Sequence, residues 1–252
     1  MTRAIITDLD RTLLRTDKTV SDFSVRILGA CRARGIPVMA ATARPARAIA
    51  DYLKKIPFDA VTTLNGAVVI LPGDTVSIGI PKSDVLHFLT EMTGARDTVI
   101  SLETDSGIFA NTDIPLWQPM VYPDLQNAPL PDHIYKILLS SESCRLSDIL
   151  PDILPENTYF TVADRKLYQI MHTDATKRNG IMRMLQAFGL SPEDAVYFGD
   201  DNDDIESVRM CGTGVAVSNA IPQVLAAADA VADSNDEDGV ARYIEKMILS
   251  GC

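Results

Sequence analysis

Short apolar runs alternate with amphipathic segments along the first part of the chain. The runs occupy residues 4–6, 36–41 and 61–64. Their β-branched content and short length are typical of strands that a parallel sheet buries on both faces. The segments between them, 20–35 and 45–55, carry helix start and stop signals. The order strand, helix, strand, helix, strand predicts the first half of a doubly wound α/β sheet.

The alternation stops after residue 66. A hairpin turning at Pro72-Gly73-Asp74 comes first, and helices, hairpins and a proline-rich loop then follow without a regular order. Strands at 168–171 and 195–198, with a helix between them, restore the alternation. The irregular stretch is typical of an α+β domain inserted into an α/β one.

We therefore predict an α/β protein with a doubly wound, parallel-sheet, Rossmann-like core formed by residues 1–81 and 167–252. Residues 82–166 form the inserted α+β cap domain in this interpretation. We expect the cap to open and close about hinges near Pro81 and Lys166.

Composition narrows the possible partners. The 252 residues are 46% hydrophobic and 23% charged, as in an ordinary globular protein, and the net charge of −11 argues against nucleic acid or an anionic membrane. The scattered cysteines show no metal or disulfide spacing, and no signal peptide or membrane-length apolar run is present. We expect a soluble protein of the reducing cytoplasm; the sequence predicts nothing about oligomeric state. The four scattered cysteines that support the expectation of a reducing compartment are Cys31, Cys144, Cys211 and Cys252.

Two aspartates, Asp8 and Asp10, follow the first apolar run. At positions i and i+2 of an extended chain they project to the same side, at the strand end where open α/β sheets bind ligands. A buried carboxylate pair is costly unless a cation offsets it. The pair indicates a metal-assisted acid site, and the alternative is a plain polar turn in which Asp10 caps the following helix.

Three other polar features also end core strands or begin core helices: Thr42, Lys177 and the acidic turn 200–204. The carboxyl-end loops of a doubly wound sheet converge, so one pocket could hold all of them. The turn is either a solvated helix start or a cation site. A calcium loop is excluded, because Ile205 and Cys211 stand where glycine and glutamate are required, and oxygen-only ligands favour Mg²⁺.

Lys177 lies in the first turn of its predicted helix, where the helix dipole disfavours a cation. Most lysines are solvated, but this position favours contact with carboxylates or phosphate. The chemistry that fits is phosphoryl transfer through an aspartyl-phosphate. Asp8 attacks phosphorus, Asp10 transfers the proton, Thr42 binds a phosphate oxygen, and Lys177 with Mg²⁺ neutralises charge.

The ordered motifs resemble those of the haloacid dehalogenase-like (HAD) superfamily, in its Cof-type subgroup of phosphatases with a type IIB-like α/β cap. The match comprises Asp8-Leu9-Asp10-Arg11-Thr12, Thr42-Ala43-Arg44, Lys177 and the turn 199–204, with closing segments at 211–220 and 238–241. The resemblance implies a Mg²⁺ site formed by Asp8, the backbone carbonyl of Asp10, and Asp200, with Asp204 acting through bound water.

We further expect a set of residues to contact the phosphate or the substrate. This set comprises Leu9, Thr42, Ala43, Arg44, Asn65, Lys177 and Asp203. Four positions depart from the family pattern: Arg11, Ala43 and Arg178 replace glycine, and Asp203 replaces asparagine. A carboxylate at Asp203 would repel phosphate unless Asn202 or a proton compensates. Arg11 must point away from phosphorus, either to pair with the acidic turn or to meet an anionic group on the substrate.

The leading hypothesis is a Mg²⁺-dependent phosphatase of small phosphorylated metabolites, with sugar phosphates as the first choice. A phosphotransferase or mutase with the same Asp8 chemistry is the alternative. A signalling receiver would keep the aspartyl-phosphate as a message, but it needs neither a general acid such as Asp10 nor a cap.

Overall fold

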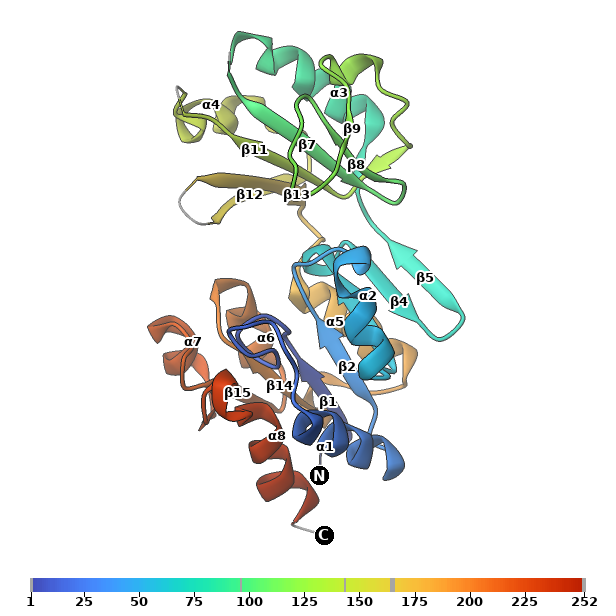
Figure 1. Ribbon diagram of the computed structural model, residues 1–252, viewed down its shortest axis with the longest axis vertical. Coiled ribbons are helices and arrows are strands. Elements are labelled where there is room, and N and C mark those ends of the chain that lie inside the picture. Colours follow the sequence, from blue (N-terminus) through green and yellow to red (C-terminus); the bar gives the residue numbers. More distant parts are fainter. Residues whose placement is uncertain (1, 96, 143, 164–165, 251–252) are drawn as a thin grey trace. The chain divides into compact units, whose positions relative to one another are not determined.

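The structure is a computed structural model that describes residues 2–95, 97–142, 144–163 and 166–250; Cys252 lies outside these ranges. The chain divides into two compact units (Figure 1). The first, called here the core unit, comprises Met1–Val76 and Thr176–Cys252, and the second, the inserted unit, comprises Ser77–Ala175. Within the described ranges, no helix combines the length and the apolar character that crossing a bilayer requires.

An eight-stranded sheet forms the centre of the core unit, in the order β16-β15-β14-β1-β2-β3-β4-β5 (Figure 1). The strands from β16 to β3 run parallel, and β4 is antiparallel to β3. The strand bounds are β1 Ala4–Thr7, β2 Val38–Ala41, β3 Ala60–Thr63, β4 Val68–Leu71, β5 Asp74–Ser77, β14 Ala195–Gly199, β15 Thr213–Val217 and β16 Ala230–Ala232. The doubly wound α/β core predicted from the sequence is confirmed.

The helices of the core unit are α1 Asp22–Ala33, α2 Ala46–Lys55, α5 Lys177–Ala187, α6 Ile205–Met210, α7 Pro222–Ala227 and α8 Gly239–Ile244. Helix α1 packs against β2 and α8, while α5 packs against β2, β3 and α6. β1 lies between β2 and β14, and its residues are fully buried as its apolar sequence predicts. The chain winds outward from β1 in both directions, so the carboxyl end of β1 is the switch point where such sheets bind ligands.

The inserted unit contains a six-stranded sheet in the order β12-β13-β11-β7-β8-β9 and a two-stranded pair, β10-β6. The strand bounds are β6 Ile80–Pro81, β7 Val99–Thr104, β8 Gly107–Ala110, β9 Met120–Val121, β10 His133–Ile134, β11 Lys136–Ser140, β12 Thr158–Ala163 and β13 Leu167–His172. Helices α3 Lys82–Glu91 and α4 Leu146–Ile153 contribute Val85, Phe88 and Leu150 to the apolar core of this unit. The predicted inserted α+β domain is therefore present.

The unit bounds differ from the sequence-based ones at both junctions. The sequence predicts that the strand at 168–171 belongs to the core, and this prediction is wrong: β13 pairs antiparallel with β11 and β12 in the sheet of the inserted unit. The apolar run identifies a strand, but it carries no information about the sheet in which that strand finds its partners. The core unit resumes at Thr176 and not at residue 167.

Candidate active site

Asp8 stands directly after β1, and the parallel pairing with β14 continues through it, because its backbone N–H donates to the Phe198 carbonyl at 2.9 Å. Helix α5 brings Lys177 to the same place. The Thr176 side chain caps this helix by accepting from the Asn179 N–H at 3.1 Å. The buried Lys177 ammonium then lies 2.9 Å from Oδ1 of Asp8. The predicted convergence of the first and third motifs is present.

Lys177 contacts two further carboxylates, Asp204 at 2.7 Å and Asp203 at 3.2 Å. Burial lowers the pKa of Lys177, but the negative charges of Asp204, Asp8 and Asp203 outweigh burial and raise the pKa well above its usual value. This explains a cation in the first turn of a helix, since three carboxylates offset the helix dipole. Burial raises the pKa of Asp8 far above its usual range, although Lys177 opposes the rise.

Asp204 organises the acidic turn that follows β14. Its Oδ1 accepts from Lys177 and from the buried Tyr197 hydroxyl, and its Oδ2 accepts the backbone N–H groups of Asp200 at 2.8 Å and Asp201 at 3.1 Å. A carboxylate has about four acceptor sites, and all are used here. The carboxylate also lies against Gly199, where a Cβ atom would come within 2.6–2.8 Å of the Asp204 side chain.

Three buried carboxylates, Asp8, Asp200 and Asp204, each offer one oxygen within 4.8 Å of the others. Asp200 accepts from the Thr12 hydroxyl at 2.8 Å, and burial raises the pKa of Asp200 to about 6. This set of mutually repelling oxygen donors fits a hard divalent cation such as Mg²⁺. Because the hydrogen bonds to Asp204 are saturated, Asp8 and Asp200 are the carboxylates with capacity left for direct ligation.

The side chain of Asp10 is engaged elsewhere. The Arg44 guanidinium donates to both carboxylate oxygens, and the Lys18 ammonium lies 2.8 Å from Oδ1. Burial raises the pKa of Asp10, but hydrogen bonds and positive charge from Arg44 and Lys18 outweigh burial and hold that pKa below its usual value. Asp10 is therefore a carboxylate in this arrangement, with its charge compensated by two cations.

The predicted phosphate-binding residues after β2 and β3 also lie in the core unit. Thr42 is buried, its backbone N–H donates to Thr62 O at 2.9 Å, and its carbonyl accepts from the Asn65 N–H at 3.1 Å. Its hydroxyl accepts from the Arg44 N–H at 3.2 Å. Ala43, next to it, is exposed. The side chain of Leu9 is fully buried in the apolar core, so only its backbone can serve a phosphate.

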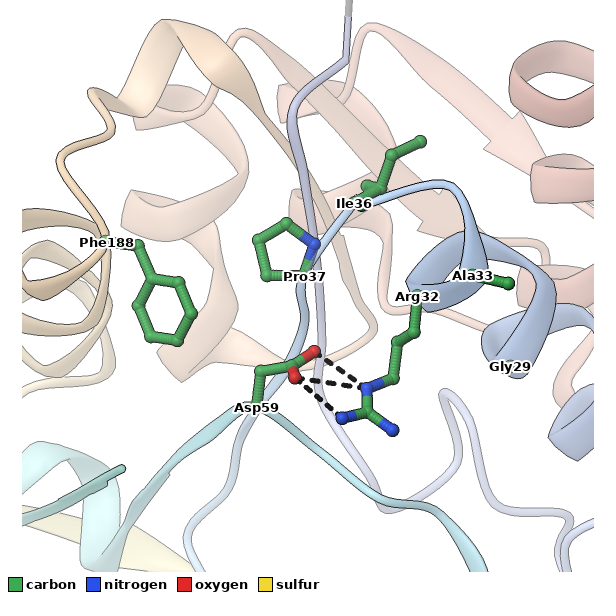
Figure 2. A pocket seen from close by; sticks show the side chains of 8 residues that line it. Gly29, Arg32, Ala33, Ile36, Pro37, Asp59 and Phe188 are labelled. Carbon is green, nitrogen blue, oxygen red and sulfur yellow. Dashed lines mark hydrogen bonds and ion pairs between the residues drawn. The ribbon is translucent and has the colours of Figure 1, made fainter. Parts of the chain in front are cut away.

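A separate pocket of about 550 Å³ lies near the amino ends of β2 and β3, at the opposite end of the sheet from Asp8 (Figure 2). Figure 2 shows Arg32 directed at Asp59, whose carboxylate it meets through bonds of 2.9–3.1 Å. Asp59 also accepts the Val38 N–H at 2.8 Å. These contacts hold α1 to the loop before β3, and none of the predicted site residues lines the pocket.

A family model for haloacid dehalogenase-like hydrolases matches residues 5–244. The chain belongs to this family. The Bacillus subtilis protein YxeH is 26% identical to this HAD chain, and the match covers 99% of this chain and 100% of YxeH. The B. subtilis 5-amino-6-(5-phospho-D-ribitylamino)uracil phosphatase YitU is 25% identical over 96% of each chain. A phosphoglycolate phosphatase of Methanopyrus kandleri is 24% identical over 98% of each chain.

Solved structures agree with the HAD fold. A haloacid dehalogenase-like hydrolase from Bacteroides thetaiotaomicron has a TM-score of 0.87 and 21% identity, covering 98% of this chain and 100% of its own. A HAD subclass IIB sugar phosphatase has a TM-score of 0.76 and 22% identity, covering 97% of this chain and 98% of its own. The fold of this chain is thus that of HAD proteins with an inserted cap. The chain is a HAD phosphatase, an enzyme that hydrolyses phosphoric monoesters.

Several residues of the HAD site escaped sequence reasoning. Tyr197 lies inside an apolar strand, where nothing distinguishes it from a core aromatic residue, and the first motif contains Thr12 without indicating its contact to Asp200. Lys18 gave no signal because solvated lysines are common. The Asn219 side-chain amide donates to the Arg11 backbone carbonyl at 2.8 Å, and its Oδ1 accepts from the Asn235 N–H at 2.9 Å.

The departures from the HAD pattern have specific surroundings. Arg11 has a left-handed backbone with φ +57°, a conformation that favours glycine. Its side chain is exposed and forms no ion pair with any residue that the structure describes, so of the two alternatives the pairing with the acidic turn is not present. Asp203 is compensated by Asn65 and Lys177, whereas Asn202 donates to Asp201. Arg178 is exposed and donates to the Asn179 side chain at 3.3 Å.

Proposed function

We propose that this chain is a Mg²⁺-dependent phosphatase that hydrolyses small phosphorylated metabolites, with sugar phosphates as the preferred class, through an aspartyl-phosphate on Asp8. The observation that carries the proposal is the buried Asp8 carboxylate at the switch point of the sheet, 2.9 Å from the buried ammonium of Lys177. A buried carboxylate beside a buried cation is a costly arrangement that a phosphoryl-transfer site uses.

In the first step, a carboxylate oxygen of Asp8 attacks phosphorus and the bond between phosphorus and the leaving oxygen breaks. Asp10 gives its proton to that oxygen, so the leaving group departs as an alcohol. In the second step Asp10 takes a proton from water, the water oxygen attacks phosphorus, and Asp8 is regenerated as inorganic phosphate forms. Lys177 supplies fixed positive charge beside the transferring group in both steps.

Asp10 must be protonated for the first step, and the hydrogen bonds from Arg44 and Lys18 favour its carboxylate form. A bound phosphate competes for the Arg44 guanidinium. Once Arg44 shares its charge with the phosphate, the proton affinity of Asp10 rises. Substrate binding thus prepares Asp10 for proton delivery in this proposal.

Mg²⁺, when bound, would supply charge neutralisation for the phosphoryl group. Asp8 and Asp200 would ligate it directly, together with the backbone carbonyl of Asp10. Asp204 would contribute through water and, more directly, by holding Lys177 and the acidic turn in place. The four hydrogen bonds that Asp204 already accepts support this indirect role.

The phosphate would be bound by groups around the carboxyl ends of β1, β2 and β3. We propose the Thr42 hydroxyl and the Lys177 ammonium as its principal donors, with Arg44 as the nearby guanidinium. The backbone of Leu9 and Ala43 and the side chain of Asn65 would complete the set, and Asp203, held by Asn65 and Lys177, would border the phosphate without donating to it. Since the net charge is −11, Arg44 and Lys177 must attract the anionic substrate locally.

Sugar phosphates are favoured by the relatives. YitU acts on a phosphoribitylamino uracil, and a structural neighbour is named a sugar phosphatase. We propose that the inserted unit, Ser77–Ala175, acts as a cap that selects the substrate, with hinges at its two junctions with the core unit.

The test is release of inorganic phosphate from a broad panel of phosphorylated metabolites, with Mg²⁺ and with chelator. We expect turnover only with Mg²⁺ and no phosphate retained on a product. Full turnover in chelator, with metal content shown to be nil, would remove the metal from the mechanism. Phosphate recovered on a product sugar would instead establish the phosphotransferase alternative.

A further inference from the structure

Lys18 and Tyr52 lie beside Asp10 and Arg44, and the mechanism proposed above gives neither of them a role in positioning Asp10. Lys18 lies 2.8 Å from Oδ1 of Asp10, and the Tyr52 hydroxyl donates to the Lys18 carbonyl at 2.9 Å. The guanidinium carbon of Arg44 lies 5.7 Å from the centroid of the Tyr52 ring, within cation–π range. Tyr52, on α2, therefore contacts both residues that bind the Asp10 carboxylate: the backbone of Lys18 and the guanidinium of Arg44.

The backbone around Lys18 is built to present its side chain. Its N–H donates to the Arg15 carbonyl at 2.8 Å, and the Arg15 N–H donates to the Thr19 carbonyl at 2.9 Å, which closes a tight turn. Lys18 occupies the left-handed region with φ +66°, an unfavourable conformation for lysine. Its side chain is 51% exposed, and exposed ion pairs contribute little to stability. Stability alone thus explains this arrangement poorly.

The two cations bind Asp10 differently. Arg44 donates to both carboxylate oxygens, whereas Lys18 contacts Oδ1 alone. If the guanidinium of Arg44 turns towards a bound phosphate, Lys18 still holds Oδ1. Oδ2 is then released, and the carboxyl group remains anchored through Oδ1 with its other oxygen available to the leaving group.

We propose that Lys18, anchored by Tyr52, is a positioning residue that fixes the Asp10 carboxyl group for proton transfer to the leaving oxygen. This inference rests on the proposed role of Asp10 as general acid and base. Proton transfer requires the two heavy atoms to be within hydrogen-bond reach, and small displacements of a reacting group cost large factors in rate.

The test compares two substrates with different leaving groups. Glycerol 2-phosphate releases an alkoxide that needs a proton, whereas p-nitrophenyl phosphate releases a phenolate that departs without one. The quantity to measure is kcat/KM, because it reports the steps up to departure of the leaving group and excludes the later hydrolysis of the aspartyl-phosphate. Lys18→Met removes the ammonium while keeping a long apolar side chain.

We expect Lys18→Met to lower kcat/KM for glycerol 2-phosphate by about 10-fold or more, and for p-nitrophenyl phosphate by less than about 3-fold. Lys18→Arg should restore most of the loss. Tyr52→Phe keeps the ring beside Arg44 and removes the hydroxyl that anchors Lys18, so it should shift the ratio of the two values in the same direction by a smaller factor.

Lys54→Met is the matched control, because Lys54 is an exposed lysine on the same helix as Tyr52 and, among the described residues, pairs with Asp51 alone. Lys54→Met should leave kcat/KM unchanged for both substrates. Melting temperatures show whether each variant is folded. An equal fall for both substrates, or an unchanged value for glycerol 2-phosphate in Lys18→Met, would overturn the positioning role.

Asp10→Asn separates this inference from the proposed function. If Asp10 is the general acid, Asp10→Asn lowers kcat/KM for glycerol 2-phosphate far more than for p-nitrophenyl phosphate. If Asp10→Asn shows no such difference, the proposed role of Asp10 fails. If Asp10→Asn shows it and Lys18→Met does not, the positioning role alone fails.

Discussion

The side-chain amide of Asn65 donates to the carboxylate of Asp203 at 2.8 Å and so joins the loop after β3 to the acidic turn after β14. Lys177 approaches the same carboxylate at 3.2 Å. Burial is the main reason that the pKa of Asp203 is raised, and Lys177 opposes the rise. Asp203 is thus a carboxylate near the proposed phosphate position. The Asn65 amide and the Lys177 ammonium compensate its negative charge.

Replacement of Asp203 by asparagine should strengthen phosphate binding. Asp203→Asn removes a negative charge beside the incoming anion and leaves more of the Lys177 charge for it. We expect the inhibition constant of inorganic phosphate and the KM of a phosphomonoester to fall several-fold, with little change in kcat. Asp201→Asn is the control, because it removes the same charge from the same turn without contact to Lys177. Weaker phosphate binding in Asp203→Asn would contradict this account.

Replacement of Asp8 by asparagine should abolish turnover while the protein remains folded. The substitution removes the nucleophile, a buried carboxyl group whose pKa is raised by burial and by neighbouring carboxylates. Steady-state assays should therefore show no activity above background, and the melting temperature should equal or exceed that of the wild type. Appreciable turnover by the purified variant would show that another group attacks phosphorus.

The metal-free protein should become less stable as the pH rises. Burial raises the pKa of Asp200 from 3.8 to about 6, so the folded state holds this proton more tightly than the unfolded chain. The contribution of this proton to the free energy of unfolding is complete below about pH 4 and is lost as the pH rises through about 6. The raised pKa of Asp8 acts in the same direction. The lowered pKa of Asp10 acts in the opposite direction, with its contribution lost as the pH falls below about 4.

Melting temperatures in chelator at pH 5 and pH 7.5 measure this effect, and the difference between the wild type and Asp200→Asn isolates it from the other titrating groups. The wild type should lose several degrees more than the variant, since about 1 kcal/mol corresponds to roughly 2–4 °C for chains of this size. Mg²⁺ should restore the wild type at pH 7.5 and have little effect on Asp200→Asn. Equal pH dependence in both proteins would rule out Asp200 as the source.

Arg11→Ala tests whether this exposed arginine contacts the substrate. Its side chain has no ionic partner among the described residues and follows directly after Asp10, so an anionic group on the leaving portion is the partner we expect. The variant should raise KM about 10-fold for substrates with a second anionic group and change kcat little. Singly anionic substrates should be nearly unaffected. A similar change for both substrate classes would assign Arg11 a structural role.

The central parts of this site could be predicted because they depend on simple geometry. Asp8 and Lys177 are far apart in sequence, yet strand ends of a parallel sheet converge and the ordered motifs mark them. Tyr197 could not be predicted, since its hydroxyl role depends on the carboxylate that reaches it from the turn. Lys18 could not be predicted either, because its contact with Asp10 depends on one left-handed backbone position.

The assignment of β13 shows the corresponding limit for the fold. Its residues form a strand as expected, but pairing is a property of two strands together. Antiparallel partners at β11 and β12 are close along the chain, and they place β13 in the inserted unit. Periodicity describes one segment at a time and therefore gives no information on such a choice.

The central position of β1 has a consequence for biosynthesis. β1 emerges from the ribosome before the other strands of its sheet, and one of its two neighbours, β14, begins only at Ala195. Until then β1 has an unpaired edge, and an unpaired apolar strand is a site for aggregation. The inserted unit, by contrast, is fully synthesised at Ala175 and can fold while the core still waits for its last strands. A ribosome that stalls before Ala195 therefore leaves a chain with its nucleophile made and β1 paired on one side only, with β2.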